Sequence, residues 1–437
     1  MKINFSKRQI YILIGVGIVL IAFLSVLFGN VIRPIKKINL TFWGTEDNIQ
    51  VYSKLISDYK QRAPNVSITY VYKNPINYDQ ELLTAWANDQ GPDIFVLSDK
   101  LLGKYQNYIA PLSLTSDQNY TLKNIRDDFP AVIEDNLVYN DYLYGLPLYL
   151  DTLALYYNPA YFNYYNIALP PRTWEDAQVL ALKFKKLDSY SRISRSGLAL
   201  GLADNVDRFE DILSILIMQK GGNMTDINKS FAAFNEDVRR YNRNFNPATE
   251  ALNYYTQFAL PNKSTYNWNA LLDSSLKAFV DGKVVMVIGY NQDKKYIAEK
   301  NPEFEYNIAP LPYFAETDQR ISYAQYLFTT VSKKSKNQDQ AWQFIKFLSE
   351  KEPALYYYQQ TQNPPARRDL ISFYQNDPNN GVFIQQSLSA KNWYQKDPET
   401  VRGIFRQTIN SIINSSSTLK EAVSLASNRI TQLLQSK

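Results

Sequence analysis

Residues 38–97 alternate between strand patterns and helix patterns, and this alternation constrains the fold more than any other feature of the sequence. The strand segments are rich in β-branched and aromatic residues, and the helix segments place apolar side chains three and four positions apart. The order strand–helix–strand–helix–strand predicts an α/β sheet with parallel strands. The expected strands are residues 38–44, 66–72 and 93–97, and the expected helices are residues 48–62 and 78–88.

Ligands of such sheets bind at the carboxyl ends of the strands. The loops at these ends are residues 45–48 and 98–100, which contain Glu46, Asp47, Ser98 and Asp99. These four residues are candidate ligand contacts. The alternative is local: Glu46 and Asp47 would favour the positive end of the following helix, and Ser98 and Asp99 would cap one.

The chain has no cysteine and no histidine. This composition excludes disulfides, thiolate nucleophiles, zinc fingers and iron–sulfur centres, and it removes the commonest general base and transition-metal ligand. Only a hard-cation site made of oxygen ligands stays open. We expect no cofactor and no metal.

The net charge of +5 comes from the N-terminus. Residues 1–37 hold six Lys and Arg and no acid, so the remaining 41 basic residues face 42 acidic ones. Proteins that bind nucleic acid carry a basic body. The rest of this chain is near neutral, and no nucleic-acid partner is expected.

An apolar run begins at Ile10 and ends at Phe28. As a helix it would measure roughly 28 Å, about one hydrocarbon core. It is longer than a secretory apolar region, and no A-x-A-like cleavage site follows it. The run therefore predicts an uncleaved transmembrane anchor, with a cleaved signal peptide as the alternative. Three basic residues lie on each side of the run, so local charge does not set its orientation.

Seven segments, some of which overlap the strands and loops above, resemble, when taken together and in order, the extracellular solute-binding proteins of ABC importers, specifically the maltose-binding-like group. Each motif is weak alone, but the set covers the chain from about Leu40 to its end. The segments are LTFWGTEDN (40–48), GPDIFVLSD (91–99), LYGLPLYLDTLALYYNPAYF (143–162), ALPPRTWEDA (168–177), QKGGNMTD (219–226), GKVVMVIGY (282–290), and AWQFIKFLSEKE (341–352) followed by PPARRD (364–369).

The resemblance implies a periplasmic-binding-protein-like (type II) fold, in which two α/β lobes enclose a ligand cleft and close about a hinge. It places crossing segments near residues 150–152, 323–327 and 373–380, with Leu150, Thr152 and Tyr326 as hinge residues. The implied division is an N-terminal tip, anchor and linker (1–37), a first lobe (38–150 with 326–375) and a second lobe (151–325 with 376–437).

The resemblance also implies a saccharide site built from aromatic faces and from acceptors for hydroxyl groups. Its candidate members are Tyr149 and Asp151 in the first crossing, Tyr290 and Gln292 after a predicted strand, and Trp393 and Tyr394. The alternatives are core packing for the aromatic residues and a solvated hinge carboxylate for Asp151. Gln292 stands where many sugar binders have a stacking Trp, which leaves the identity of the sugar open.

The implied function is capture of a small solute, most consistent with a carbohydrate, and its delivery to the permease subunits of an ABC transporter. The body would lie outside the cell membrane, held by a single-pass anchor. Two alternatives stay open: a tethered sensor or adhesion module that keeps the fold, and a glycan-processing enzyme. The sequence holds no G-x-S-x-G, P-loop or G-x-G-x-x-G motif, so an enzyme is not expected.

Overall fold

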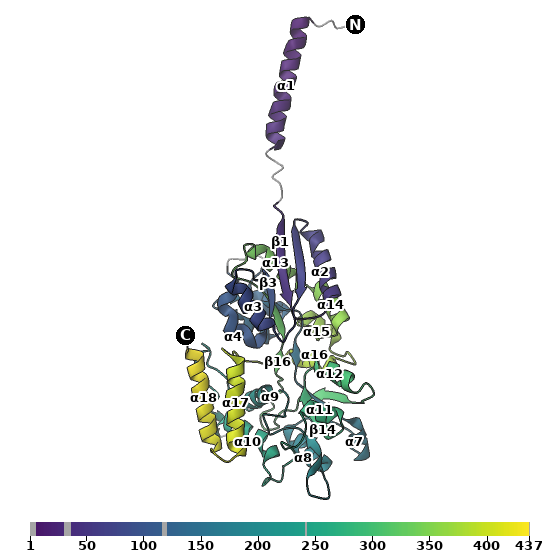
Figure 1. The fold of residues 1–437 in the computed structure, drawn as a ribbon, viewed down its shortest axis with the longest axis vertical. Helices are drawn as coiled ribbons and strands as arrows, with labels where there is room; N and C mark the ends of the chain where they lie inside the picture. Colours follow the sequence, from purple (N-terminus) through teal and green to yellow (C-terminus); the bar gives the residue numbers. More distant parts are fainter. Residues whose placement is uncertain (1–5, 30–35, 116–119, 241–242, 437) are drawn as a thin grey trace.

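The computed structural model describes residues 6–29, 36–115, 120–240 and 243–436. Figure 1 shows helix α1 (Lys7–Gly29) and, apart from it, two lobes stacked along the long axis of the molecule. The described apolar side chains of α1, from Ile10 to Phe23, are mostly exposed. The side chain of Phe28, and residues 1–5 and 30–35 of the predicted N-terminal segment, lie outside the described residues.

Within the described residues, no helix combines the length and the apolarity needed to cross a bilayer.

The first lobe is built on a five-stranded sheet in the order β2-β1-β3-β17-β7. The predicted parallel pairing is confirmed, because β1 pairs in parallel with both β2 and β3. Strand β17 comes back from the second lobe and pairs antiparallel with β3 and β7. The strands are β1 (Ile38–Gly44), β2 (Val66–Tyr72), β3 (Ile94–Ser98), β7 (Leu146–Pro147) and β17 (Leu327–Val331), with β4 (Leu112–Ser113), β5 (Val138–Tyr139) and β6 (Tyr142–Leu143) in a small second sheet.

Amphipathic helices cover this sheet and bury their apolar faces in one core. Phe42 of β1 and Phe344 of α13 meet edge to face in it, with ring centroids 6.1 Å apart. The helices are α2 (Ile49–Arg62), α3 (Tyr78–Ala87), α4 (Leu102–Tyr105), α5 (Leu122–Asp128), α6 (Ala131–Leu137), α13 (Gln338–Leu348) and α14 (Lys351–Thr361); the neighbouring α15 (Arg368–Tyr374) packs in a separate small cluster.

The second lobe has its own core and a sheet in the order β10-β11-β14-β9-β15. Its helix α8 begins after Thr173, which forms the predicted capping box with Asp176. Gly197 lets this helix approach the sheet, because a Cβ there would lie 2.2 Å from the Ala181 carbonyl oxygen. The strands are β9 (Ala154–Tyr157), β10 (Lys186–Leu187), β11 (Ile193–Leu198), β14 (Val284–Gly289) and β15 (Asn307–Pro310), with β12 (Val238–Arg240) and β13 (Arg243–Phe245) as a separate hairpin.

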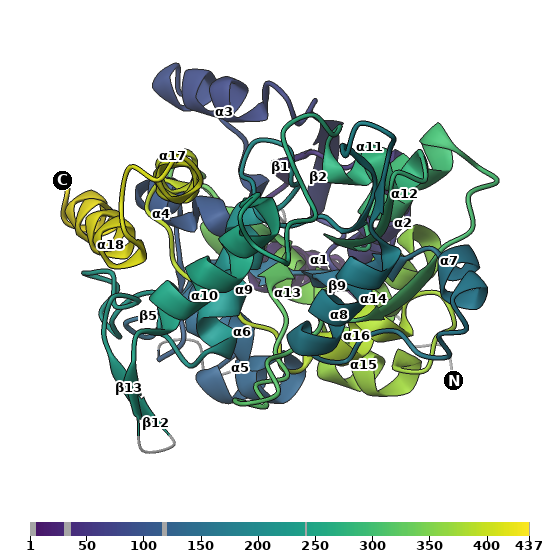
Figure 2. The ribbon, with the colours of Figure 1, turned by 90° about the horizontal axis from the view of Figure 1, so that it is seen from below.

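The last two helices, α17 and α18, lie side by side at one edge of the second lobe, as both views show (Figures 1 and 2). They pack on α10, which comes from the middle of the chain. The second-lobe helices are α7 (Pro159–Tyr164), α8 (Trp174–Phe184), α9 (Phe209–Gln219), α10 (Pro247–Thr256), α11 (Ser275–Val280), α12 (Asp293–Lys300), α16 (Gly381–Ser387), α17 (Pro398–Ile413) and α18 (Leu419–Gln435).

The chain crosses between the two cores in three places. Two crossings pair as short antiparallel strands, β8 (Asp151–Thr152) and β16 (Ala324–Gln325). The third passes through α15 and α16, where Ile371 and Ile384 pack with Tyr358 in a small cluster of their own. These crossings place the loops of both lobes against each other.

Candidate functional site

Asp151 lies in the first crossing and is almost fully buried. Its carboxylate accepts the backbone N–H groups of Thr152, Asn291 and Gln292, at 2.8, 2.9 and 3.1 Å. Burial raises the pKa of this carboxyl to about 7, against the lowering effect of the three backbone donors. Asp151 thus fixes the loop that follows β14 to the hinge of the second lobe.

The flanking hinge candidates are also buried and bonded. The Leu150 N–H donates to the Pro364 carbonyl, and the Thr152 hydroxyl donates to the Phe383 carbonyl at 3.3 Å. The Tyr326 hydroxyl accepts a hydrogen bond from the Asn136 side-chain amide at 3.1 Å. Every predicted hinge residue therefore contacts a segment distant in sequence.

Glu46 points into the first lobe, among tyrosines. Its carboxylate accepts the hydroxyl of Tyr52 at 2.6 Å and, by a short bond, that of Tyr357. Burial raises its pKa. Tyr149 stacks on Tyr357 with the ring planes 9° apart, so Glu46 orders an aromatic surface at the lobe boundary. The neighbouring Asp47 is exposed.

Tyr149 marks the point where several candidates converge. Burial raises its pKa well above the usual value, and the negative charges of Glu46, Asp151 and Asp99 raise it further. The carboxylates of Glu46, Asp99 and Asp151, which come from three separate segments of the chain, thus all raise the pKa of this one tyrosine. An aromatic face beside acceptor oxygens is the pattern predicted for this site.

Asp99 follows β3 and faces the second lobe. Its carboxylate accepts from the Ser98 hydroxyl at 3.2 Å and from the Asn392 side-chain amide at 2.9 Å. Burial raises the pKa of Asp99 to about 6, opposed by the charge of Lys100. Ser98 therefore contacts Asp99, and Asp99 joins the first lobe to the C-terminal part of the second lobe.

An ion pair that sequence reasoning missed spans the boundary beside Asp99. Lys100 of the first lobe donates to Asp211 of α9 at 2.5 Å, and Asp211 also accepts the Tyr290 hydroxyl at 2.8 Å. Both Asp211 and Tyr290 are buried, with exposed fractions of 1% and 0%. One signal was available in the sequence, because Lys100 directly follows the candidate Asp99. Nothing in the sequence pairs Lys100 with Asp211.

Two acceptor atoms at this boundary are buried without a hydrogen-bond partner among the described residues. They are Oδ1 of Asn291 and Oε2 of Glu210. Buried acceptors are normally satisfied, so such atoms call for a donor. Gln292, between Asn291 and α12, has an exposed side chain and contributes its backbone N–H.

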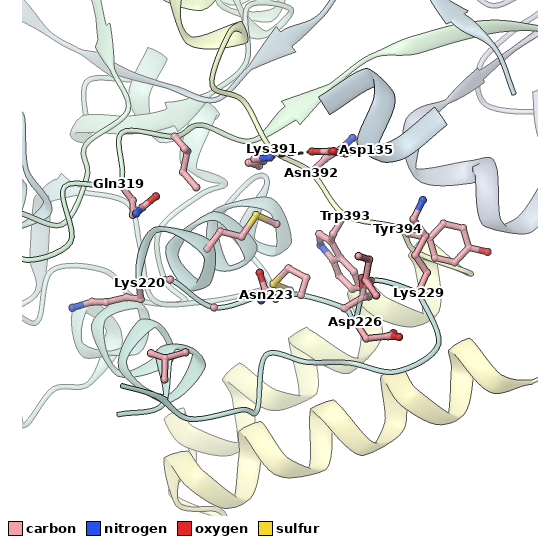
Figure 3. A pocket seen from close by; sticks show the side chains of 18 of the residues that line it. Asp135, Lys220, Asn223, Asp226, Lys229, Gln319, Lys391, Asn392, Trp393 and Tyr394 are labelled. Atoms are coloured by element: carbon pink, nitrogen blue, oxygen red, sulfur yellow. Dashed lines mark hydrogen bonds and ion pairs between the residues drawn. The ribbon is translucent and has the colours of Figure 1, made fainter. Parts of the chain in front are cut away.

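Trp393 and Tyr394 lie away from Asp151, along a cavity of about 600 Å³ that we call the side pocket (Figure 3). Both lobes line it: Asp135 and Asn136 come from α6, and Lys220 to Lys229 follow α9. Trp393 is largely buried and donates to the Ser214 hydroxyl at 3.2 Å, while Tyr394 is half-buried. The predicted site residues thus divide between a central boundary and this side pocket.

No group of three or more acidic side chains in the described residues has the arrangement of a metal site.

The chain is similar to a known family of proteins. The family model of the bacterial extracellular solute-binding proteins matches residues 54–382, which is most of the chain. The maltotriose-binding protein of Pyrococcus abyssi is 25% identical over 138 residues, or 32% of this chain. That match spans 28% of the archaeal protein.

Solved structures are similar over nearly the whole body. The cyclic α-maltosyl-1,6-maltose-binding protein of Arthrobacter globiformis superposes with a TM-score of 0.75 at 17% identity, covering 91% of this chain and 99% of that one. The sugar-binding protein MalE of Xanthomonas citri gives 0.72 at 18% identity, covering 91% and 97%. At these identities the likeness establishes the two-lobe, periplasmic-binding-protein-like fold. With the family model covering most of its length, the chain belongs to the bacterial extracellular solute-binding proteins.

Proposed function

We propose that this protein captures a saccharide between its two lobes and delivers it to the permease of an ABC transporter. The observation that carries the proposal is the set of groups at the central boundary. Asp99, Asp151 and Asp211 supply carboxylates, Tyr149 and Tyr290 supply rings, and two buried acceptors lack partners. Sugar hydroxyls donate to such acceptors, and aromatic rings cover the apolar face of a sugar.

The relatives support the same ligand class, since the archaeal protein is named for maltotriose and the Arthrobacter structure for a cyclic maltose derivative. Family membership supports an ABC permease as the partner and a body outside the membrane. We assign no catalytic residue, because the family consists of binding proteins.

The lobes that close on the ligand would be residues 38–150 with 326–375, and 151–325 with 376–437. Their separate cores support this division, and the paired crossing strands support bending at Leu150, Thr152 and Tyr326. The ion pair of Lys100 with Asp211 spans the lobes and would separate when they open.

Helix α1 would hold the body at the membrane. The charge-free part of its sequence, from Gln9 onward, and the exposure of its described apolar side chains support this part of the proposal. Cells expressing the full chain should retain it in membranes washed with alkaline carbonate. Val16→Asp with Val19→Asp should release it, because each central acid costs about 3 kcal/mol in a bilayer. Retention of that variant would exclude α1 as the anchor.

Ligand capture is tested by thermal shift and calorimetry of the full chain in detergent, against neutral mono-, di- and oligosaccharides, amino acids and polyamines. A ligand at 100 times its dissociation constant adds about 2.7 kcal/mol of stability. Tyr149→Ala should weaken a saccharide hit at least about tenfold. Tyr164→Ala, at an exposed position of α7, is the matched control. Binding of amino acids or polyamines alone would overturn the saccharide; binding of a sugar without permease copurification would favour a tethered sensor.

A further inference from the structure

The side pocket carries more positive charge than its own carboxylates balance. Four cationic side chains and two acidic ones line it: Lys220, Lys229, Arg239, Lys391, Asp135 and Asp226. The partners of each show which charges are already satisfied.

Both carboxylates are engaged. Asp135 pairs with Lys391 at 3.0 Å, an ion pair that joins the lobes (Figure 3). Asp226 accepts three backbone N–H groups of the loop that follows it, which lowers its pKa against burial. Lys220 pairs outside the pocket, with Glu250 at 3.2 Å and Glu316 at 3.5 Å.

Lys229 and Arg239 are the two cations left over. Neither has a carboxylate within ion-pair distance in the described part of the chain. Burial lowers the pKa of the Lys229 ammonium, and the charge of Asp135, which is already paired with Lys391, offsets this lowering only in part. That ammonium lies over the rings of Tyr394 and Tyr139, at 5.4 and 5.8 Å from their centroids.

The surroundings of Lys229 suit a sugar. Tyr139 belongs to the first lobe and Tyr394 to the C-terminal part of the second lobe, so the ammonium lies between groups that the lobes bring together. The side-chain amides of Asn223 and Asn392 also line the cavity, and its volume of about 600 Å³ exceeds that of one sugar ring.

We infer that the side pocket binds the negatively charged group of an acidic saccharide, a carboxylate or a sulfate ester, through Lys229 and Arg239. The inference rests on the proposed function and specifies its ligand class. The oxyanion would replace the counter-ion that Lys229 lacks, and the Tyr394 ring would contact the sugar. A charged ligand reaching this pocket contacts both lobes and so favours their closure.

The test uses calorimetry on the full chain in detergent with ligands matched in shape and different in charge. One pair is α-1,4-linked trigalacturonate and its methyl ester; the other is a sulfated galactose disaccharide and its unsulfated form. We expect one or both acids to bind at least about tenfold more tightly than their neutral partner. The pair that shows the preference distinguishes carboxylate from sulfate.

Variants assign the preference to the pocket. Lys229→Gln should bring the acid to the affinity of its neutral partner, and Lys229→Arg should keep most of the preference. Lys60→Gln, at an exposed position of α2, should change neither. Equal binding of acid and neutral partner would overturn the inference and leave saccharide capture standing. If Lys229→Gln weakened the binding of the acid and of its neutral partner alike, Lys229 would not recognise the negative charge of the ligand, and the inference would be overturned. Absence of binding by any saccharide would overturn both proposals.

Discussion

Two buried carboxylates at the lobe boundary are satisfied in different ways. Asp151, with 4% of its surface exposed, accepts only backbone N–H groups, all of which lie on the second-lobe side of the hinge. Asp211, with 1% exposed, accepts from the ammonium of Lys100 in the other lobe and from the Tyr290 hydroxyl. Opening the lobes would leave the bonds of Asp151 intact and would break the ion pair of Asp211.

Because of this difference, we expect Asp151 to contribute mainly to the free energy of unfolding and Asp211 mainly to the closure of the lobes. Loss of the Asp151 bonds has no compensating motion, because Asp151 and all three N–H groups lie on the same side of the hinge. Loss of the Lys100 partner can be relieved by opening, which returns Asp211 to water. The cost of breaking the ion pair is therefore limited by the free energy of lobe opening.

The largest effect is expected for Asp151→Ala, which leaves three N–H groups without their acceptor. The free energy of unfolding should fall by about 2–4 kcal/mol, as each buried donor loses a bond. Urea unfolding followed by tryptophan fluorescence measures it. Glu303→Ala, at an exposed position, should change stability by less than about 0.5 kcal/mol. A loss no greater than that of the control would show that the hinge tolerates unpaired donors.

The pH dependence sharpens the same contrast. The pKa values of about 7 for Asp151 and about 6 for Asp99 exceed the value of about 3.9 in an unfolded chain. The folded protein then holds protons that the unfolded chain has released, so this stability is complete below about pH 4 and is lost as the pH rises to 7. The expected slope is on the order of 1 kcal/mol per pH unit between pH 5 and 7.

Asp151→Asn removes one of these titrations and should flatten the slope, as measured by urea unfolding at several pH values. The same slope in both proteins would mean that Asp151 is ionised at neutral pH.

Thr173→Ala should lower the free energy of unfolding through a change that lies away from the lobe boundary. It removes the hydroxyl that accepts the Asp176 N–H at 3.1 Å at the start of α8. Unfolding should become easier by about 1 kcal/mol. Small-angle X-ray scattering should show an unchanged radius of gyration, because the cap lies within the second lobe. A change in radius would show that lobe stability and closure are coupled.

Lys100→Met should have the smallest effect on unfolding, below about 1 kcal/mol if opening relieves the unpaired Asp211. The same variant should increase the radius of gyration of the unliganded protein in X-ray scattering. Asp211→Asn should act in the same direction. The contrary result, a loss of several kcal/mol with no change in radius, would mean that the lobes do not separate here.

Much of the fold was predictable from local patterns. Strands Ile38–Gly44 and Val66–Tyr72 and helix Ile49–Arg62 lie where periodicity predicted them, and β1 pairs as expected. The spacing of apolar side chains along a helix or a strand involves only residues close together in sequence, so it can be recognised before any packing is known. The antiparallel return of β17 was not visible, because it depends on a crossing more than two hundred residues away from β3.

The candidate site was predictable only in part. Strand ends pointed to Glu46 and Asp99, and resemblance pointed to Asp151, Tyr149 and Tyr290. Local sequence could not show that Glu46 is held by tyrosines from two helices, or that Asp47 stays in water.

The sequence by itself determined the strand–helix order, the apolar N-terminal helix and the family, because these depend on residues close together or on motifs in order. Only the tertiary structure decided which charges are paired, buried or left free. Lys100 and Asp211 are 111 positions apart and meet only when two lobes pack. Lys229 is left without a counter-ion because the lining carboxylates are already bonded elsewhere. Pairing and desolvation are properties of the assembled boundary, and no local pattern records them.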